Sequence, residues 1–438
     1  MPNLQGVLQR LRTTLGKSSV QDNLWMIAAR VISVAIQALY FIFVARFLGS
    51  KEYGELIGVL SLVAMLSPFV GVGYAHLLMR TVSRDRSSFR TEWGKSLFVW
   101  GWSSLLGIGL VMLLASRIWG SQVSPWLVLW MALGDYWGVC LLEFSSSAFL
   151  SVGVAARPAQ LKVFFSAVKL LAVGALWLVP DWRSAETWSI FYCIASVLPA
   201  LAAFVLASRQ AGWPLWPKPN CDWELGQGFY FSIAGSAETI NANADKTLLS
   251  SLVNEEAAGI YGAGYRFVDV GYQPILAIGA ANYARFFQAG THGIDGSIQF
   301  AKRLFPLIAG YGVLGGLGMF FFAPVVEWIL GSEYREAIGV LRWFAPVHLI
   351  LGMQYLAADC LTSSGHQGQR SLIQVTAAIL NVVLNLILIP SYSWAGAIWA
   401  TLASETFKMV GLWGAAAFFL AARVGHEGQG LIHGLIHG

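Results

Sequence analysis

The chain has 438 residues, of which 56% are hydrophobic and only 12% are charged, and its mean hydropathy is +0.61. A soluble globular protein carries about 25% charged residues, so this composition excludes a soluble protein and indicates a polytopic membrane protein. The net charge of +5 is small for the length. It fits loops that face anionic lipid, so we expect membrane lipids as partners and no nucleic acid.

An amphipathic segment opens the chain. Within residues 1–23, apolar side chains recur at helical spacing beside several basic ones, which is typical of a helix on the inner membrane surface. Apolar runs of about 20 residues follow, each long enough to cross a bilayer, so we expect about twelve spans. These runs cover 24–47, 55–78, 94–116, 125–147, 158–179, 187–208, 226–252, 258–284, 302–327, 340–363, 371–389 and 394–420.

Loop charges predict the orientation, and weak repeats predict the domains. Lys and Arg concentrate in alternate connections, above all in 79–95, which places both termini in the cytoplasm. The motif at 47–54 recurs in similar form at 252–259, about half the chain later. We therefore predict an all-α fold with two six-helix lobes related by a pseudo-two-fold axis along the membrane normal. The expected parts are the lobes 24–208 and 226–420, a cytoplasmic linker at 209–225, and a cytoplasmic tail at 421–438 that we expect to be disordered.

Basic residues inside the expected spans are the most informative feature. A cation in hydrocarbon costs about 2.5–3.5 kcal/mol on insertion scales, so it must pair, reach the headgroups or face a wet cavity. Cations at different depths of a cavity suit an anion that crosses the bilayer. These residues are Arg30, Lys162, Lys169, Lys246, Arg266, Arg342 and Lys408.

Structural pairing is the alternative to ligand binding for most of these cations. Lys169 and Asp135 lie at similar depth in consecutive spans. Arg266 is three residues from Asp269, and Lys408 is three from Glu405, which is pairing distance on a helix. The Asp245–Lys246 pair could also tether the outer end of its helix, and Arg30 could reach the inner headgroups.

Polar stripes indicate helices that line a cavity. In the first span Arg30, Ser33, Gln37 and Tyr40 share one helical face. The seventh span carries a stripe that includes Asn243 and Lys246, with Glu238 and Asp245 on a neighbouring face as candidates to bind a coupling H⁺ or Na⁺. Asn381 and Asn385 of the eleventh span are further cavity candidates.

Signals for an enzyme, a cofactor or a metal site are absent from the sequence. It contains no HExxH, GxSxG or P-loop motif, and its four cysteines have no CxxC spacing. His433 and His437 are four residues apart but lack a third ligand. We therefore predict a transporter that needs no cofactor.

Several motifs resemble those of a known family. They are Ala45-Arg-Phe-Leu-Gly-Ser-Lys-Glu-Tyr-Gly54, Glu255-Glu-Ala-Ala-Gly-Ile-Tyr261, Ile329-Leu-Gly-Ser-Glu-Tyr334 and Leu380–Pro390 followed by Trp394-Ala-Gly-Ala397. In order and spacing the chain resembles the polysaccharide transporter, or oligosaccharide flippase, family. That family belongs to a superfamily that also includes multidrug and toxin extruders.

The resemblance implies a flippase for an undecaprenyl-pyrophosphate-linked oligosaccharide in the bacterial inner membrane, serving exopolysaccharide or O-antigen synthesis. It implies that arginines of the first and eighth helices hold the pyrophosphate, which points to Arg30 and Arg266. We expect Lys169 and Lys246 to assist them. A polysaccharide polymerase and glycosyltransferases would be protein partners. Two alternatives stay open at this point: a cation-coupled multidrug antiporter of the same superfamily, and a scaffold for a polysaccharide-synthesising complex.

Overall fold

The structure is a computed structural model that describes the backbone of residues 17–154, 156–179, 182–217 and 223–437. Within these ranges, side chains are described between residues 32 and 423, except at 175–176, 230 and 234. Helix makes up 89% of the structure, and the described ranges contain no strand, which confirms the all-α prediction. The amphipathic segment predicted at 1–23 lies mostly outside the described residues.

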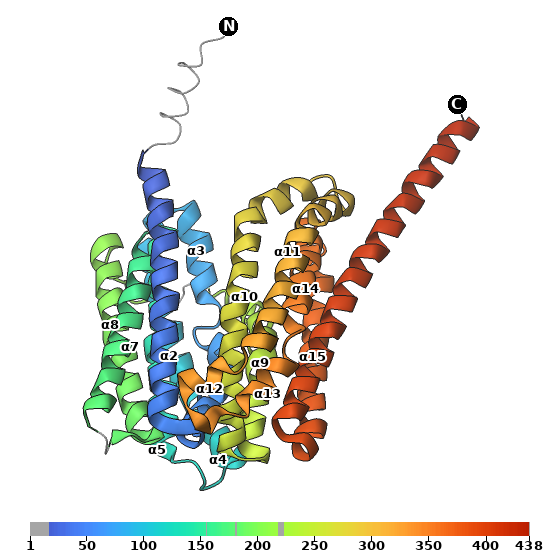
Figure 1. The fold of residues 1–438 in the computed structure, drawn as a ribbon. Helices are drawn as coiled ribbons and strands as arrows, with labels where there is room; N and C mark the ends of the chain where they lie inside the picture. The colour runs from blue at the N-terminus through green and yellow to red at the C-terminus, as the bar shows by residue number, and fades with distance from the viewer. Residues whose placement is uncertain (1–16, 155, 180–181, 218–222, 438) are drawn as a thin grey trace. The chain divides into compact units, whose positions relative to one another are not determined.

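The first of two compact units comprises the residues up to Leu48 together with Leu66–Ile233. Its core contains Leu78, Trp93 and Phe149, which come from three different helices and are almost fully buried. Unit 1 holds the first part of α2 (Lys17–Leu66), then η1 (Ser67–Phe69), α3 (Tyr74–Arg84), η2 (Arg86–Ser88), α4 (Phe89–Ile118), α5 (Pro125–Leu133), the π-helical η3 (Gly134–Val139), α6 (Cys140–Ser151), α7 (Ala156–Leu178) and α8 (Ala185–Ala211). Figure 1 labels α2, α3, α4, α5, α7 and α8 among these.

Unit 2 comprises Gly49–Met65 and the chain from Ala234 onward. Its core contains Phe286, Leu356 and Leu361. It holds the second part of α2, most of α9 (Leu225–Leu252), α10 (Glu255–Gly290), α11 (Ile294–Phe322), α12 (Val325–Leu330), η5 (Ser332–Tyr334), α13 (Ala337–Trp343), α14 (Val347–Ser363) and α15 (Gln367–His437).

The units differ from the predicted lobes in two segments. Residues 49–65, which we expected in the first lobe, belong to unit 2. The linker residues and the start of α9 belong to unit 1. The linker packs on α4: Leu215 N–H donates to the carbonyl oxygen of Arg90 at 2.9 Å, and Trp216 meets Phe98 edge to face.

Every predicted span lies on helix, but the breaks fall elsewhere than expected. The second span is interrupted at 67–73, where Gly71, Val72 and Gly73 all have positive φ. The tenth is bent by 48° between α13 and α14. The tail expected to be disordered instead continues α15 to His437, although Gly425, Gly428, Gly430 and Gly434 are poor helix formers.

Two pairs of predicted spans are joined almost without a loop. By length and hydropathy, six helical segments among the described residues could cross a membrane, or seven if the bent pair counts as one. Ile32–Arg84 and Gln367–Arg423 are 53 and 57 residues long. At ~1.5 Å per residue such lengths are at least twice a bilayer core, so each can hold two spans. They turn at Gly49 (φ 76°) and Ser393 (φ 51°). The chain is thus a multi-pass membrane protein, and the total of about twelve spans stays a prediction.

Two glycines of the repeated motifs permit a close helix contact within unit 2. A Cβ on Gly54 would overlap the carbonyl oxygen of Glu255, and a Cβ on Gly259 would overlap the carbonyl oxygen of Ser50. This backbone-to-backbone approach places residues 49–65 in unit 2. These glycines of the repeated motifs therefore allow the helices to pack closely.

Replacing Gly54 with alanine should lower the melting temperature of the detergent-solubilised protein, because the helices must move apart. Overpacking of this kind typically costs about 1–3 kcal/mol. Gly318→Ala in α11 is the matched control, since no heavy atom lies within 4 Å of a Cβ there. That change should leave stability equal or raise it by ~0.5–1 kcal/mol. Equal melting temperatures for both variants and wild type would contradict the close approach.

Candidate functional site

The polar stripe of α2 contacts α7 and α8 within unit 1. Gln37 donates through Nε2 to Ser33 Oγ at 3.0 Å and to Ser166 Oγ at 3.3 Å. One turn further on, the Tyr40 ring lies 5.9 Å from the ring of Trp188, centroid to centroid. Because its nitrogen faces the hydroxyls, the amide oxygen of the exposed Gln37 points away from them. Arg30 lies on the same helix, and its side chain is outside the described residues.

A π-helical turn, η3, positions Asp135 in unit 1. Within this turn the carbonyl oxygen of Tyr136 accepts a hydrogen bond from Trp100 Nε1 of α4 at 2.9 Å. In lipid such a carbonyl must find a partner within the protein. Asp135 is 8% exposed and accepts a hydrogen bond from the Tyr192 hydroxyl at 3.3 Å. Such π-helical turns are frequent at functional sites.

Lys169 is held by aromatic rings next to this carboxylate. Its Nζ lies 4.0 Å from the ring centroid of Tyr192 and 4.4 Å from that of Phe165. Tyr192 therefore contacts both charged groups: its ring lies against the Lys169 ammonium, and its hydroxyl donates to Asp135. The arrangement favours the structural pairing of Lys169 with Asp135, and a role in binding the substrate stays a prediction.

Lys246 forms a closed pair with Asp245 in unit 2. The two side chains are 8% and 1% exposed, with Lys246 Nζ 3.3 Å from Asp245 Oδ1. The ammonium also donates to the carbonyl of Ala242 and lies 4.0 Å from the ring centroid of Tyr265. Asp245 in turn accepts from the Tyr261 hydroxyl. This geometry favours the structural alternative for Lys246 over direct contact with a substrate.

A chain of hydrogen bonds extends from this pair to the predicted asparagines. The hydroxyls of Tyr261 and Thr401 lie 3.3 Å apart, and Ser404 donates to the carbonyl of Thr401 at 3.0 Å. Asn381 Nδ2 donates to Ser404 Oγ at 3.1 Å, and Asn385 Nδ2 donates to Asn381 Oδ1 at 2.9 Å. Both asparagines are fully buried. They join the two parts of α15 and face protein in this conformation.

Arg266 lies within a predicted span of unit 2 and is accessible. Its side chain is 46% exposed, and Nη1 lies 4.0 Å from Asp269 Oδ2. It also lies within hydrogen-bonding reach of the Tyr53 hydroxyl. A guanidinium has five N–H donors in a planar fork, a geometry that can bind a phosphate bidentately.

The remaining candidates lie on α9. Glu238 is exposed. Asn243 donates through Nδ2 to the carbonyl oxygen of Thr239 at 2.9 Å, so its amide turns back to its own helix. Glu238 thus stays accessible for ion binding, whereas Asp245 is already engaged by Lys246 and Tyr261.

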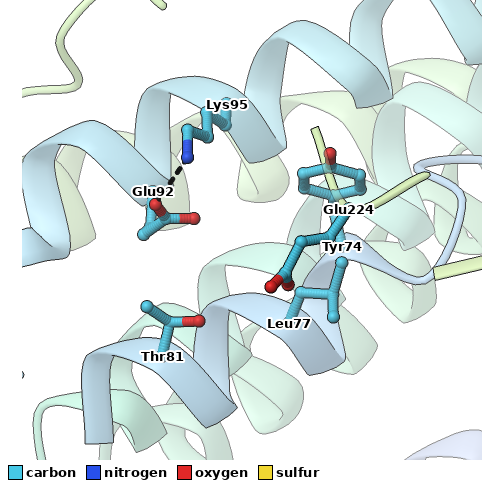
Figure 2. A pocket seen from close by; sticks show the side chains of 6 residues that line it. All are labelled: Tyr74, Leu77, Thr81, Glu92, Lys95 and Glu224. Carbon is cyan, nitrogen blue, oxygen red and sulfur yellow. Dashed lines mark hydrogen bonds and ion pairs between the residues drawn. The ribbon is translucent and has the colours of Figure 1, made fainter. Parts of the chain in front are cut away.

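A small pocket lies at the predicted cytoplasmic end of unit 1, with a volume of about 100 Å³. Figure 2 shows Lys95 bonded to Glu92, with Nζ 2.9 Å from Oε1, while Glu224 of the linker approaches from the α3 side. Arg80 pairs with Glu224. The lining charges are therefore already neutralised within the protein. The pocket is lined by Tyr74, Leu77, Thr81, Glu92, Lys95 and Glu224.

The loop beside this pocket is capped by Asp85. Its carboxylate accepts from the Ser87 N–H at 2.9 Å and from the Ser87 hydroxyl at 2.7 Å. These hydrogen bonds lower the pKa of Asp85 below its ordinary value. The pocket therefore lies beside a short, fixed turn between α3 and α4.

Sequence reasoning missed the π-helical turn and a cluster around Glu405. The signal for the first is weak: Gly134 and Gly138 are four residues apart, and α8 packs directly on both, at Tyr192 and Ser196. For the second, the Glu405–Lys408 pair was predicted and is confirmed at 2.9 Å between Nζ and Oε2. Its further partners come from helices far apart in sequence, which no local pattern reveals.

Comparison with known proteins places the fold. Residues 19–142 match the family described as polysaccharide biosynthesis protein. Among curated proteins, none is significantly similar to the chain in sequence. An inward-facing multidrug resistance MATE family transporter of the MOP superfamily superposes with a TM-score of 0.71 at 12% identity, covering 90% of this chain and 98% of that one.

Two other solved structures share the fold. The lipid II flippase MurJ, in an inward closed conformation, superposes with a TM-score of 0.62 at 13% identity, covering 91% of this chain and 88% of that one. A MOP superfamily transporter from Pyrococcus furiosus, described as having a binding pocket of reverse polarity, gives 0.61 at 13% identity, with 90% and 95% covered. At 12% to 13% identity, these neighbours show that the chain has the same fold.

Replacing Lys246 alone with methionine should destabilise the protein, because Asp245 would be left as a buried, uncompensated charge. Breaking a buried ion pair typically costs about 3–5 kcal/mol. The double variant Asp245→Asn, Lys246→Met should recover much of that loss. Thermal unfolding in detergent measures both. A single variant as stable as wild type but defective in transport would instead make Lys246 a substrate ligand.

Proposed function

We propose that this protein is a flippase that moves an undecaprenyl-pyrophosphate-linked oligosaccharide across the bacterial inner membrane by alternating access. The product would serve exopolysaccharide or O-antigen synthesis, with a polysaccharide polymerase and glycosyltransferases as partners. The observation that carries the proposal is an accessible guanidinium, Arg266, inside a predicted membrane span. A half-exposed arginine at that depth is unfavourable in lipid and useful in a wet cavity that binds an anion.

Arg30 and Arg266 are the proposed pyrophosphate ligands. A diphosphate offers several anionic oxygens, and arginine binds such groups in a planar, bidentate manner. Lys169 and Lys246 would then act less directly, since rings hold the first and Asp245 holds the second. Export is also favoured electrically, because an inside-negative potential drives an anion outward by about 2.3 kcal/mol per charge per 100 mV.

The comparisons support a lipid-linked substrate and do not identify its glycan. One neighbour of the same fold is a flippase for lipid II, as its name states. The family match is to polysaccharide biosynthesis proteins. Coupling to H⁺ or Na⁺ is part of the proposal, with Glu238 as the accessible carboxylate and Asp245 as the buried one.

A cation-coupled multidrug antiporter is the second candidate. The MATE fold and the buried carboxylates Asp135, Asp245 and Asp359 favour it, because a cationic drug needs acidic partners. In unit 2, however, Asp245 is neutralised by Lys246, and Arg266 is exposed beside Asp269. This charge pattern suits an anionic substrate better.

Proteoliposomes that contain a fluorescent polyprenyl-pyrophosphate oligosaccharide test the proposal directly. We expect wild type to flip the lipid and the double variant Arg30→Ala, Arg266→Ala to lose most of the rate, since both phosphate ligands are gone. Arg335→Ala is the control, because this arginine is 79% exposed on the surface beside Glu327. Fully retained flipping in a folded double variant would overturn the assignment. Ethidium efflux by wild type without lipid flipping would favour the antiporter.

A further inference from the structure

Glu405 of α15 sits at the centre of a buried polar cluster in unit 2. Its Oε1 accepts from Asn241 Nδ2 at 2.5 Å, and its Oε2 accepts from Gln354 Nε2 at 2.6 Å. Lys408 Nζ lies 3.0 Å from Oε1 and 2.9 Å from Oε2. The carboxylate is therefore satisfied as an anion by donors from three helices, α9, α14 and α15.

The same cluster holds two acceptors that have no donor. Asn241 Oδ1 and Gln354 Oε1 are buried and make no hydrogen bond. A buried, unsatisfied polar atom typically costs about 1–3 kcal/mol. Each of these oxygens belongs to an amide whose nitrogen faces Glu405. If the carboxylate took up a proton, one amide could turn over, and its oxygen would accept the new O–H of Glu405. The cluster can thus satisfy either protonation state of this side chain.

Lys408 is the more exposed member of the pair. Its side chain is 16% exposed, whereas that of Glu405 is 6% exposed. Once the carboxylate is neutral, Lys408 loses its ionic partner but keeps its own charge. An anion that reaches the cluster would then find a cation in a site of low polarity, where electrostatic attraction is strong.

We propose that Glu405 and Lys408 form a proton-controlled anion site, in which Glu405 takes a proton from water as Lys408 exchanges the carboxylate for a phosphate oxygen. The inference rests on the proposed function, because the anion is the phosphate group of the lipid-linked substrate. Proton uptake and anion binding are then linked, and each favours the other by the same factor. No covalent bond to the substrate forms or breaks; one O–H bond forms on Glu405 as one O–H bond of a hydronium ion in the solution breaks.

Other titratable groups surround the cluster. Tyr265 and Tyr272 of α10 lie within electrostatic range of Glu405. Glu238 and Asp359 act on Tyr272 as well. The Asp245–Lys246 pair of α9 neutralises itself. Glu405 differs from all of these carboxyl groups, because it alone, among the residues described, pairs with Lys408 and faces two amides.

The test is proton uptake on addition of inorganic pyrophosphate to the purified protein in weakly buffered detergent solution with a pH indicator. Wild type should take up more protons per pyrophosphate bound than Glu405→Gln, and subtraction removes the protons of pyrophosphate itself. The wild-type affinity should rise as pH falls, by at most ~10-fold per pH unit for one linked proton. Glu405→Gln should lose this dependence, and Lys408→Met should weaken binding and abolish the extra uptake.

Glu327→Gln is the matched control, since it removes a carboxylate from the surface pair with Arg335, 3.8 Å from it. It should behave as wild type. Equal proton uptake by wild type and Glu405→Gln, or unchanged affinity in Lys408→Met, would overturn the proposal. If Glu405→Gln does not fold, the infrared carboxyl band of wild type replaces it: pyrophosphate must increase the protonated carboxyl signal, and a constant signal refutes the site.

The two proposals fail in different ways. Proton-linked pyrophosphate binding without any lipid flipping would leave the Glu405–Lys408 site intact and remove the flippase. Lipid flipping with no linked proton would do the reverse. The flipping assay and the binding assay therefore need to be run on the same preparation.

Discussion

The absence of water in the bilayer core is the constraint on which this structure depends. Every polar group at that depth must find its partner within the protein, or line a cavity that holds water. The carbonyl of Tyr136 in the π-helical turn accepts from the indole of Trp100, and the ammonium of Lys246 contacts a carboxylate, a carbonyl and an aromatic ring. Partnered groups of this kind hold the helices of each unit together, so polarity in the spans is first of all a packing force.

That constraint separates the charged residues into two groups. Lys246 and Asp245 are closed off by their neighbours, whereas Arg266 and Asp269 remain about half exposed at a distance of 4.0 Å. Exposure at that depth carries a cost in lipid that a substrate can offset. The accessible arginine is therefore a better guide to function than the number of cations, which equally describes a set of structural pairs.

The sequence was sufficient for the fold class and for the helical segments, because apolar runs of bilayer length have one stable conformation in lipid. It also predicted the Glu405–Lys408 pair, whose spacing of three residues is local. It could not place Asn241 and Gln354 on the same carboxylate, because that contact depends on how three helices pack. The break at 67–73 and the assignment of 49–65 to unit 2 were not predicted for the same reason. In the sequence Gly54 is typical of a loop, and its packing role becomes visible only with its contact at Glu255.

Partner exchange connects these observations to transport. A carrier must release its substrate, so a cation that binds the anion needs another partner when the substrate has left. Lys408 has one in Glu405, and Glu405 has two amides that can serve it as donors or acceptors. Lys169 stands in a related position, because Tyr192 joins it to Asp135. Under the proposal that Glu405 takes up a proton as Lys408 binds a phosphate oxygen, this exchange of partners would couple proton movement to the binding and release of an anion.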